Sequence, residues 1–321
     1  MSAADPGVAQ LALDIAARVR AAVVPSLGDP SSRVRVGVAP GGDVTMAIDE
    51  VAERVVEEMC RDAGDIAFYS EDRGYVAFGR PRAILVVDPI DGTRPAAAGL
   101  ESCCVSVAVV PPSEDATLGD VGFGVVHEIK SGCRFSASRG EGVVADIAVR
   151  PSANVDLRSL FWTAGLRGRP ALPLTIVLEE LIDGSSMRGG FFDLGSATFD
   201  MTRIVTGQLD AYVDVGRYVL DVFPALEPRF REVGEGAVCT NFPYDVAAAA
   251  LIVEEAGGVV TRPDGAPVGD HPAVGSGDGY GIAVLASASR ALHDELLAAV
   301  ERGVGRLGDR LGPGGGARSV Q

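Results

Sequence analysis

Lysine is nearly absent from this chain of 321 residues, because Lys130 stands alone and arginine supplies the other 27 of the 28 basic residues. Neither a Schiff-base environment nor a phosphate loop ending in lysine surrounds Lys130, so both chemistries are excluded. Acidic residues outnumber basic ones by 44 to 28, which gives a net charge of −16. Such a chain is not expected to bind a nucleic acid polymer. A small phosphorylated substrate remains compatible with it, because a bound divalent cation reverses the local field.

Histidine and cysteine are also scarce, and their spacing is uninformative. The 3 histidines and 5 cysteines form neither C-x-x-C nor H-x-x-x-H patterns, so no zinc site is expected. No apolar stretch approaches about 18 residues, and no charged-then-apolar segment opens the chain. With an odd cysteine count and an ordinary apolar fraction of 47%, the sequence predicts a reduced, cytoplasmic, globular protein without a membrane span.

The first half of the chain is predicted to form helices followed by an antiparallel meander. Apolar residues at helical spacing, and an apolar run from Ala83 to Val87, carry this prediction. Thr45 is expected to cap the second helix, and residues 37–42 are expected to form a mobile loop. The expected elements are helices over 8–24 and from Thr45 onward, and strands over 83–87, 105–110, 122–127 and 134–138.

The second half is predicted to alternate helices and strands. The expected elements are helices over 196–206, 245–257 and 288–302, and strands over 211–215 and 259–261. We place the boundary between the halves near 151–157, which gives an N-terminal half of 1–153 and a C-terminal half of 154–307. Residues 308–321 are low in apolar content and are expected to form a disordered tail.

Two carboxylates, Asp88 and Asp91, follow the apolar run with only Pro89 and Ile90 between them. Like charges held so close repel each other unless a cation lies between them, and Mg²⁺ prefers carboxylate, phosphate and water oxygens. An Asx-type turn, in which both side chains only cap backbone N–H groups, is the simpler interpretation of this motif alone.

Three further features favour the metal site. Glu71 follows another short apolar stretch, and Asp245 opens a helix of small residues. Gly92 and Thr93 add two backbone N–H groups and a hydroxyl beside the carboxylates, as a phosphate group requires. Together these parts predict a carboxylate-held metal site that hydrolyses phosphate esters.

These motifs resemble those of the inositol monophosphatase family, the lithium-sensitive, Mg²⁺-dependent phosphatases whose superfamily includes fructose-1,6-bisphosphatases. The match includes Glu71, Asp88-Pro-Ile-Asp-Gly-Thr93 and the helix opened by Asp245. Asp43-Val-Thr-Met-Ala-Ile-Asp49 is similar to the D-x-V-T-x-x-D segment of the family, and two later segments end at Ala197 and Asp214. The resemblance implies an α+β fold, a layered α/β/α/β/α sandwich of the inositol monophosphatase and fructose-bisphosphatase type, and a homodimer.

The resemblance also implies roles for individual residues. Thr93, hydrogen-bonded to Asp49, would help deprotonate the attacking water. The N–H groups of Gly92 and Thr93 would bind the phosphate. Two or three Mg²⁺ ions would be held by Glu71, Asp88, the Ile90 carbonyl, Asp91 and Asp245. The alcohol part of the substrate would be contacted by Gly195, Ser196, Ala197 and Asp214.

The chain departs from the family pattern at three places that bear on the substrate. Arg94-Pro95-Ala96 replaces the usual x-N-F after D-G-T, and Phe192 stands where inositol-phosphate enzymes often have arginine. About 28 residues separate Gly216 from Asp245, where family members have a handful. The segment 217–241 is either a tolerated surface insertion or a substrate or dimer-contact loop with arginines for a second anion. Arg94 would meet a second phosphate or carboxylate, or pair with a surface acid.

Five other residues are not expected to be functional. Cys103 and Cys104 are expected to be buried in a strand, and Trp162 in the core. His127 is expected to be structural, and His293 is expected to lie on the surface.

The sequence therefore predicts a Mg²⁺-dependent phosphomonoesterase acting on a small phosphorylated cyclitol, sugar or nucleoside. A bisphosphate-specific phosphatase, of the fructose 1,6-bisphosphate or 3′-phosphoadenosine 5′-phosphate type, is the alternative within this class. A non-catalytic descendant that binds a phosphorylated ligand is the alternative outside it.

Overall fold

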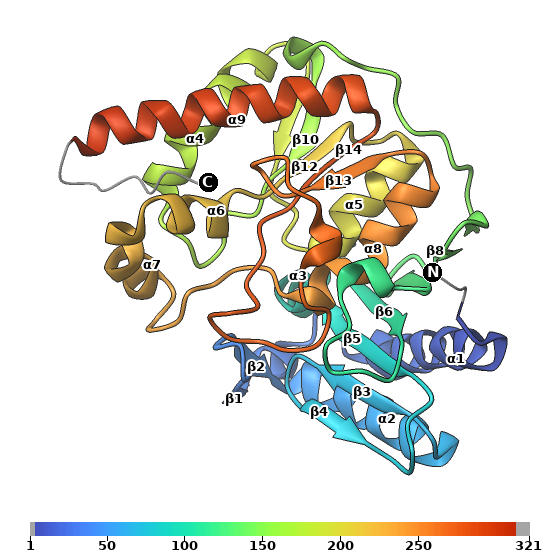
Figure 1. Cartoon of the computed structure of the whole chain (residues 1–321). Coiled ribbons are helices and arrows are strands. Elements are labelled where there is room, and N and C mark those ends of the chain that lie inside the picture. Colours follow the sequence, from blue (N-terminus) through green and yellow to red (C-terminus); the bar gives the residue numbers. More distant parts are fainter. Residues whose placement is uncertain (1–3, 313–321) are drawn as a thin grey trace.

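The computed structural model of the chain describes residues 4–312 (Figure 1). Its helices are α1 (Pro6–Val23), α2 (Ala47–Ala63), α3 (Thr93–Ala98), α4 (Ala171–Ser185), α5 (Ala197–Thr206), α6 (Gly216–Val222), α7 (Glu227–Val233), α8 (Pro243–Glu255) and α9 (Arg290–Leu311). Its strands are β1 (Arg35–Val38), β2 (Val44–Met46), β3 (Ala67–Ser70), β4 (Gly74–Ala77), β5 (Ile84–Asp91), β6 (Cys104–Val110), β7 (Phe123–Glu128), β8 (Arg134–Ser138), β9 (Gly142–Ala145), β10 (Phe161–Thr163), β11 (Gly190–Phe192), β12 (Ala211–Val213), β13 (Val259–Thr261) and β14 (Leu285–Ser287).

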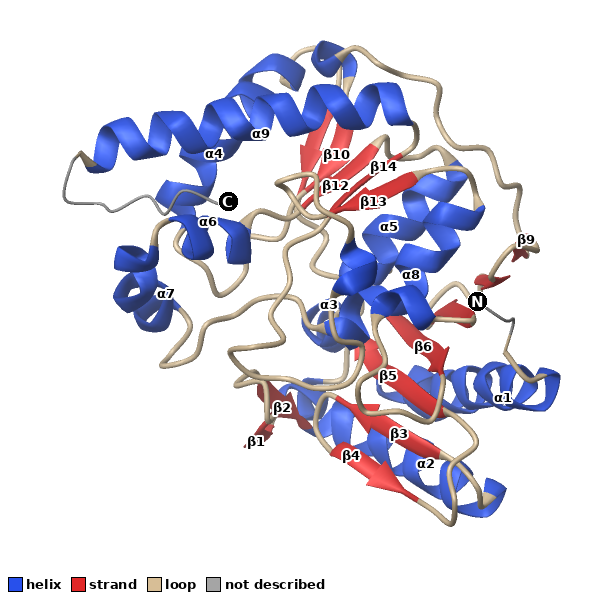
Figure 2. Cartoon of the chain, viewed as in Figure 1, coloured by secondary structure: helices blue, strands red, loops and turns tan. Residues whose placement is uncertain are grey.

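A seven-stranded sheet in the order β4-β3-β5-β6-β7-β8-β9 forms the larger of the two main sheets (Figure 2). Only β3 and β5 pair in parallel, and the other neighbours in this sheet are antiparallel. Helices α1 and α2 pack on one face, and α8 and α5 pack on the other. Because strand β5 is covered on both faces, all eight of its residues are buried, which explains its unbroken apolar run.

A five-stranded sheet in the order β11-β10-β12-β14-β13 forms the second. Helices α5 and α8 lie between the two sheets, and α4 and α9 cover the outer face of the smaller one. The layers are therefore helices, sheet, helices, sheet, helices. The chain passes from one sheet to the other between Ala145 and Phe161, in the segment that contains the expected boundary. The division into halves at 153/154 stays a prediction.

The segment 217–241 contains helix α7 and all of helix α6 except Gly216. Its apolar side chains belong to the core that also contains side chains of α4 and α9. Phe223 is 1% exposed and Phe230 is fully buried. Sequence reasoning missed these helices because each is only seven residues long, too short for a periodic apolar pattern to stand out.

Several expected boundaries are wrong. Residues 37 and 38 of the expected loop lie in strand β1, where Val38 pairs with Val44, and 39–42 lie in the connection between β1 and β2. Thr45 lies in β2, and the side chain of Asp49 caps helix α2 by accepting from Met46 N at 2.8 Å. Helix α9 continues to Leu311, four residues into the expected disordered tail. The rest of that tail, 313–321, lies outside the described residues.

Trp162, Cys103 and Cys104 are fully buried, as predicted, but His293 is not a surface residue. Its ring lies between two hydroxyl groups, with Nε2 at 2.8 Å from Thr261 Oγ1 and Nδ1 at 2.9 Å from Ser287 Oγ. The prediction failed because the helix pattern cannot show that β13 and β14 place hydroxyls against this face. Burial lowers the pKa of His293 to about 4.

The buried imidazole predicts a loss of stability in mild acid. Below pH 6.5 the unfolded chain binds a proton at His293, whereas the folded chain binds it only near pH 4, so stability falls as the pH falls through this window. We expect this residue to lower the free energy of unfolding by on the order of 2 kcal/mol between pH 7 and pH 5. Urea unfolding at pH 7 and pH 5 should show a smaller pH difference in His293→Gln than in the unsubstituted protein. An equal difference in the two proteins would contradict the prediction.

Candidate metal and phosphate site

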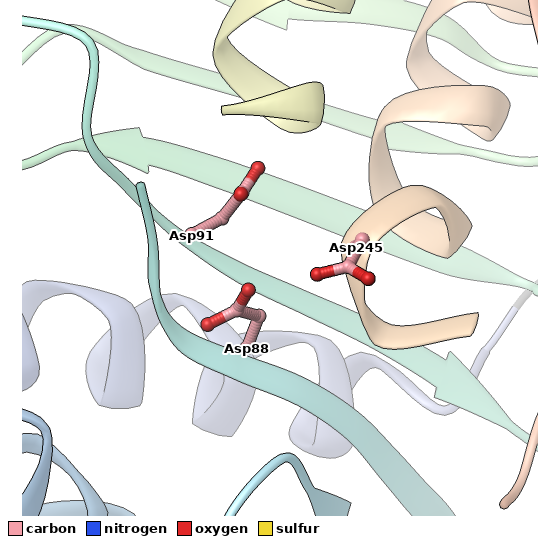
Figure 3. Close-up of side chains that lie close together, drawn as sticks. All are labelled: Asp88, Asp91 and Asp245. Carbon is pink, nitrogen blue, oxygen red and sulfur yellow. The ribbon is translucent and has the colours of Figure 1, made fainter. Parts of the chain in front are cut away.

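Three carboxylates from two distant parts of the chain converge between the sheets. Asp88 and Asp91 lie at the end of strand β5, and Asp245 lies in the first turn of helix α8 (Figure 3). One oxygen from each lies within 4.8 Å of the others. Asp88 and Asp91 are 2% and 7% exposed, so water screens their charges poorly.

A break in the β5–β6 pairing aims both Asp88 and Asp91 at the same point. Asp88 pairs with Ser106 and Asp91 with Cys104, and the register shifts between them. The Asp88 side chain accepts from Ile90 N at 2.9 Å, which fixes the turn. Gly92 follows with a φ of 90°, and a Cβ there would lie 2.4 Å from the Ser102 carbonyl. Only glycine therefore fits where the chain leaves the strand.

The cluster is electrostatically unfavourable without a cation. Burial, followed by the charges of Glu71, Asp91 and Asp245, raises the pKa of Asp88 well above its usual range. Burial and the charge of Asp91 raise the pKa of Asp245 to about 8. A hard divalent cation removes this repulsion by bringing positive charge among carboxylate oxygens. The donor set therefore fits Mg²⁺.

Glu71 lies beside this cluster, at the end of β3. Its carboxylate raises the pKa of Asp88, and burial and Asp245 in turn raise the pKa of Glu71. Glu53 on α2, which sequence reasoning missed, anchors the two residues that flank Glu71. It accepts from Ser70 Oγ at 2.7 Å and from Asp72 N at 3.1 Å. In the sequence, Glu53 could have been noticed as an acidic residue on the apolar face of a predicted helix.

The expected pair of Thr93 and Asp49 is in place. Thr93 Oγ1 lies 3.0 Å from Asp49 Oδ1 and 3.1 Å from the Ile90 carbonyl oxygen. The other oxygen of Asp49 accepts a hydrogen bond from the Met46 N–H. Burial, with the charges of Asp72 and Asp43 adding to it, raises the pKa of Asp49 to about 7.

The G-S-A segment joins the site through Asp91. Ser196 Oγ donates to Asp91 Oδ2 at 2.8 Å, and Thr198 N donates to the same oxygen at 2.6 Å. Thr198, which sequence reasoning missed, also donates its hydroxyl to this oxygen. Helix α5 thus ties Asp91 to the second sheet, and Gly195, Ser196 and Ala197 line a pocket with Glu71, Asp91 and Asp245.

Asp214 is covered by other residues in this structure, and the substrate contact expected of it stays a prediction. The residue is fully buried and does not line the pocket. Its Oδ1 accepts from Arg169 Nη1 at 2.6 Å and from Gly216 N at 2.8 Å, and its Oδ2 accepts from Asn241 Nδ2 at 2.6 Å. Arg169 and Asn241 line the pocket instead. The sequence motif could not show that two polar partners cover this carboxylate.

The arginines suggested for a second anion do not line the metal-site pocket. Arg94 does not line it and is paired with Asp43 at 3.3 Å. Within segment 217–241, Arg217 is paired with Asp221, Arg229 with Glu232, and Arg231 with Glu227. Two arginines that the sequence did not single out, Arg167 and Arg169, line the pocket. They lie after β10 in a loop without a recognisable motif.

Comparisons with known proteins agree with this arrangement. The model of the Inositol monophosphatase family matches residues 7–304. The Nus factor SuhB of Xylella fastidiosa is 29% identical over 272 residues, which cover 82% of this chain and 84% of that protein. The fructose-1,6-bisphosphatase/inositol-1-monophosphatase of Methanothermobacter thermautotrophicus is 28% identical over 270 residues, covering 80% and 85%.

Solved structures show the same fold. The extragenic suppressor protein SuhB of Bartonella henselae superposes with a TM-score of 0.70 at 20% identity, covering 92% of this chain and 99% of that one. The inositol monophosphatase TM1415 of Thermotoga maritima gives 0.66 at 22% identity, covering 93% and 98%. The predicted α/β/α/β/α sandwich is thereby confirmed. Among residues 4–312, no helix has the length and apolar character that crossing a bilayer demands.

Proposed function

The chain belongs to the inositol monophosphatase family, and from this premise we propose that it is a Mg²⁺-dependent phosphomonoesterase for a small phosphorylated metabolite. The observation that carries the proposal is the convergence of Asp88, Asp91 and Asp245 beside a pocket that also contains Glu71 and the G-S-A segment. A protein that only bound a ligand would have no need for the Thr93–Asp49 pair next to these carboxylates.

The proposed cofactor is two or three Mg²⁺ ions. Glu71, Asp88, Asp91, Asp245 and the Ile90 carbonyl would hold them. When bound, magnesium neutralises charge on a phosphoryl group and lowers the pKa of water. The raised pKa values of Asp88 and Asp245 support this proposal, because a site that repels its own charges gains most from a cation.

The chain's own groups orient the attacking water and the phosphate. When Thr93 Oγ1 donates its hydrogen to Asp49, its lone pairs are left to accept a hydrogen bond from the attacking water. Asp49 holds the hydroxyl in this orientation and would take the threonine proton as Thr93 Oγ1 takes one from the water. Thr93 begins helix α3, so its N–H has no acceptor within the helix and is available to a phosphate oxygen.

A phosphate-release assay tests the proposal. We expect Mg²⁺-dependent release of inorganic phosphate from at least one ester in a panel of cyclitol, sugar and nucleoside phosphates, and its loss in excess EDTA. Restored Mg²⁺ should restore the rate, because the carboxylates and not a permanently bound ion are the protein's contribution. If no ester is cleaved while phosphate esters still bind, the chain is a non-catalytic ligand-binding member of its family. The homodimer implied by the resemblance stays a prediction, which light scattering would measure.

A further inference from the structure

Two guanidinium groups share the pocket with the carboxylate cluster, although nothing in the proposed hydrolysis uses them. Arg167 and Arg169 lie on the loop between β10 and α4, and both line the pocket with Glu71, Asp91 and Asp245. The carboxylates suit magnesium and the phosphate that is cleaved. The arginines suit another group, because guanidinium binds carboxylate and phosphate oxygens in pairs.

Arg169 is held rigidly and still has donors to offer. It is 7% exposed, and its Nη1 donates to Asp214 at 2.6 Å and to the Gly165 carbonyl at 2.9 Å. Its Nε donates to the Cys239 carbonyl at 3.0 Å. Its Nη2 makes no hydrogen bond to any residue between 4 and 312 and is not fully buried, and the residue lines the pocket. That nitrogen is therefore available to a ligand.

Arg167 is poised rather than locked. Its Nη2 lies 2.8 Å from Asp43 Oδ2, and its side chain is 44% exposed. The other oxygen of Asp43 lies 3.3 Å from Arg94 Nη2. Two guanidinium groups thus share one carboxylate, and neither depends on Asp43 alone to hold a unique position. Burial alone would raise the pKa of Asp43, but the charges of Arg167 and Arg94 lower this pKa to about 2.

The backbone of this loop is fixed before any ligand binds. Leu166 N donates to Asp193 Oδ2 at 3.2 Å, and Arg169 N donates to the Leu166 carbonyl at 3.3 Å. Gly168 has a φ of 67°, and a Cβ there would lie 2.6 Å from Cys239 Sγ. A loop ordered in advance loses little entropy when its side chains bind a ligand.

We propose that Arg167, supported by Arg169, binds a second anionic group of the substrate, so that the preferred substrate is a phosphate ester that also carries another phosphate or a carboxylate. This inference rests on the proposed phosphatase function and deepens it. On binding, Arg167 exchanges Asp43 for the substrate anion, and Arg94 keeps Asp43 in place. Arg167 is thus a specificity-determining residue.

The test compares two substrates that share the cleaved ester and differ in the second anion. Fructose 1,6-bisphosphate and fructose 1-phosphate form such a pair. We expect Arg167→Leu to lower the ratio of their kcat/KM values roughly 10- to 100-fold, the usual effect of losing a hydrogen bond between charged groups. Arg167→Lys keeps the charge without the paired donors, so its ratio should lie between those of the unsubstituted protein and Arg167→Leu. Arg229→Leu, at an exposed ion pair with Glu232, is the matched control and should leave the ratio unchanged.

Each outcome decides the inference separately from the phosphatase proposal. Equal losses on both esters would mean that Arg167 binds the cleaved phosphate, and an unchanged ratio would mean that it binds neither group. Both results overturn the inference while the protein remains a phosphatase. Calorimetric binding of the same two esters with Ca²⁺ in place of Mg²⁺ covers the case in which neither is cleaved. If the unsubstituted protein binds the bisphosphate more tightly than the monophosphate, and Arg167→Leu removes this difference, the second-anion site is supported even then. Equal binding of the two esters by the unsubstituted protein would overturn it.

Discussion

Asp88→Asn is expected to abolish almost all turnover while making the metal-free protein more stable. The amide removes one negative charge from a cluster whose oxygens lie within 4.8 Å of one another, so Mg²⁺ binds more weakly. If the transition state loses several kcal/mol of charge stabilisation, the rate falls about 10³-fold. In EDTA the same change relieves repulsion between buried charges, because burial and its neighbours raise the pKa of Asp88.

Phosphate release against Mg²⁺ concentration, and urea unfolding in EDTA, measure the two effects. Asp115→Asn, on an exposed turn away from the site, is the matched control and should change neither. A rate near that of the unsubstituted protein would remove Asp88 from the proposed metal ligands. A large loss of stability in EDTA would show instead that Asp88 serves the fold.

Shortening 217–241 to a tight turn is expected to unfold the part of the molecule built on the five-stranded sheet rather than to change its specificity. The segment buries Phe223 and Phe230 in the core that also holds α4 and α9. Phe230→Ala alone is expected to lower the free energy of unfolding by about 3–5 kcal/mol, through lost burial and the cavity left behind. Removing the whole segment also deletes Asn241, which donates to Asp214.

Urea unfolding of the shortened chain and of Phe230→Ala, with activity on several esters, tests this expectation. Arg229→Ala, on the same helix α7 but exposed, should leave the unfolding midpoint unchanged. Activity should fall together on every ester. A shortened chain that unfolds at the same urea concentration and changes only its ester preference would restore the interpretation of the segment as a specificity loop.

The turn that carries Asp88 and Asp91 could be predicted because local sequence determines its geometry. Proline and glycine around Asp88 and Asp91 restrict the backbone, and the apolar run before them has no stable place except a buried strand. The order of the motifs along the chain then indicated the family. The same reasoning could not find Thr198 or Glu53, because their roles come from contacts with residues 107 and 17 positions away, respectively, and not from any local pattern.

The burial of His293 and of Asp214 has a common physical cause. Nothing in the helix that contains His293 indicates its burial, because the two hydroxyls that contact its ring come from β13 and β14. Asp214 matches a family segment, yet Arg169 and Asn241 saturate it, because the loop after β10 and the end of segment 217–241 meet there. Solvent exposure of a polar side chain depends on what packs over it, and that is a property of the whole fold.

The sequence by itself indicated the acidic residues and the class of chemistry, because the residue types in its motifs point to both, and the layered fold followed from the resemblance of those motifs to a known family. The tertiary structure alone decided which positive charges face the reaction pocket. Arg167 and Arg169 lie there and the arginines of segment 217–241 do not, because a charge acts over distances in space and the chain brings remote segments together only when it folds.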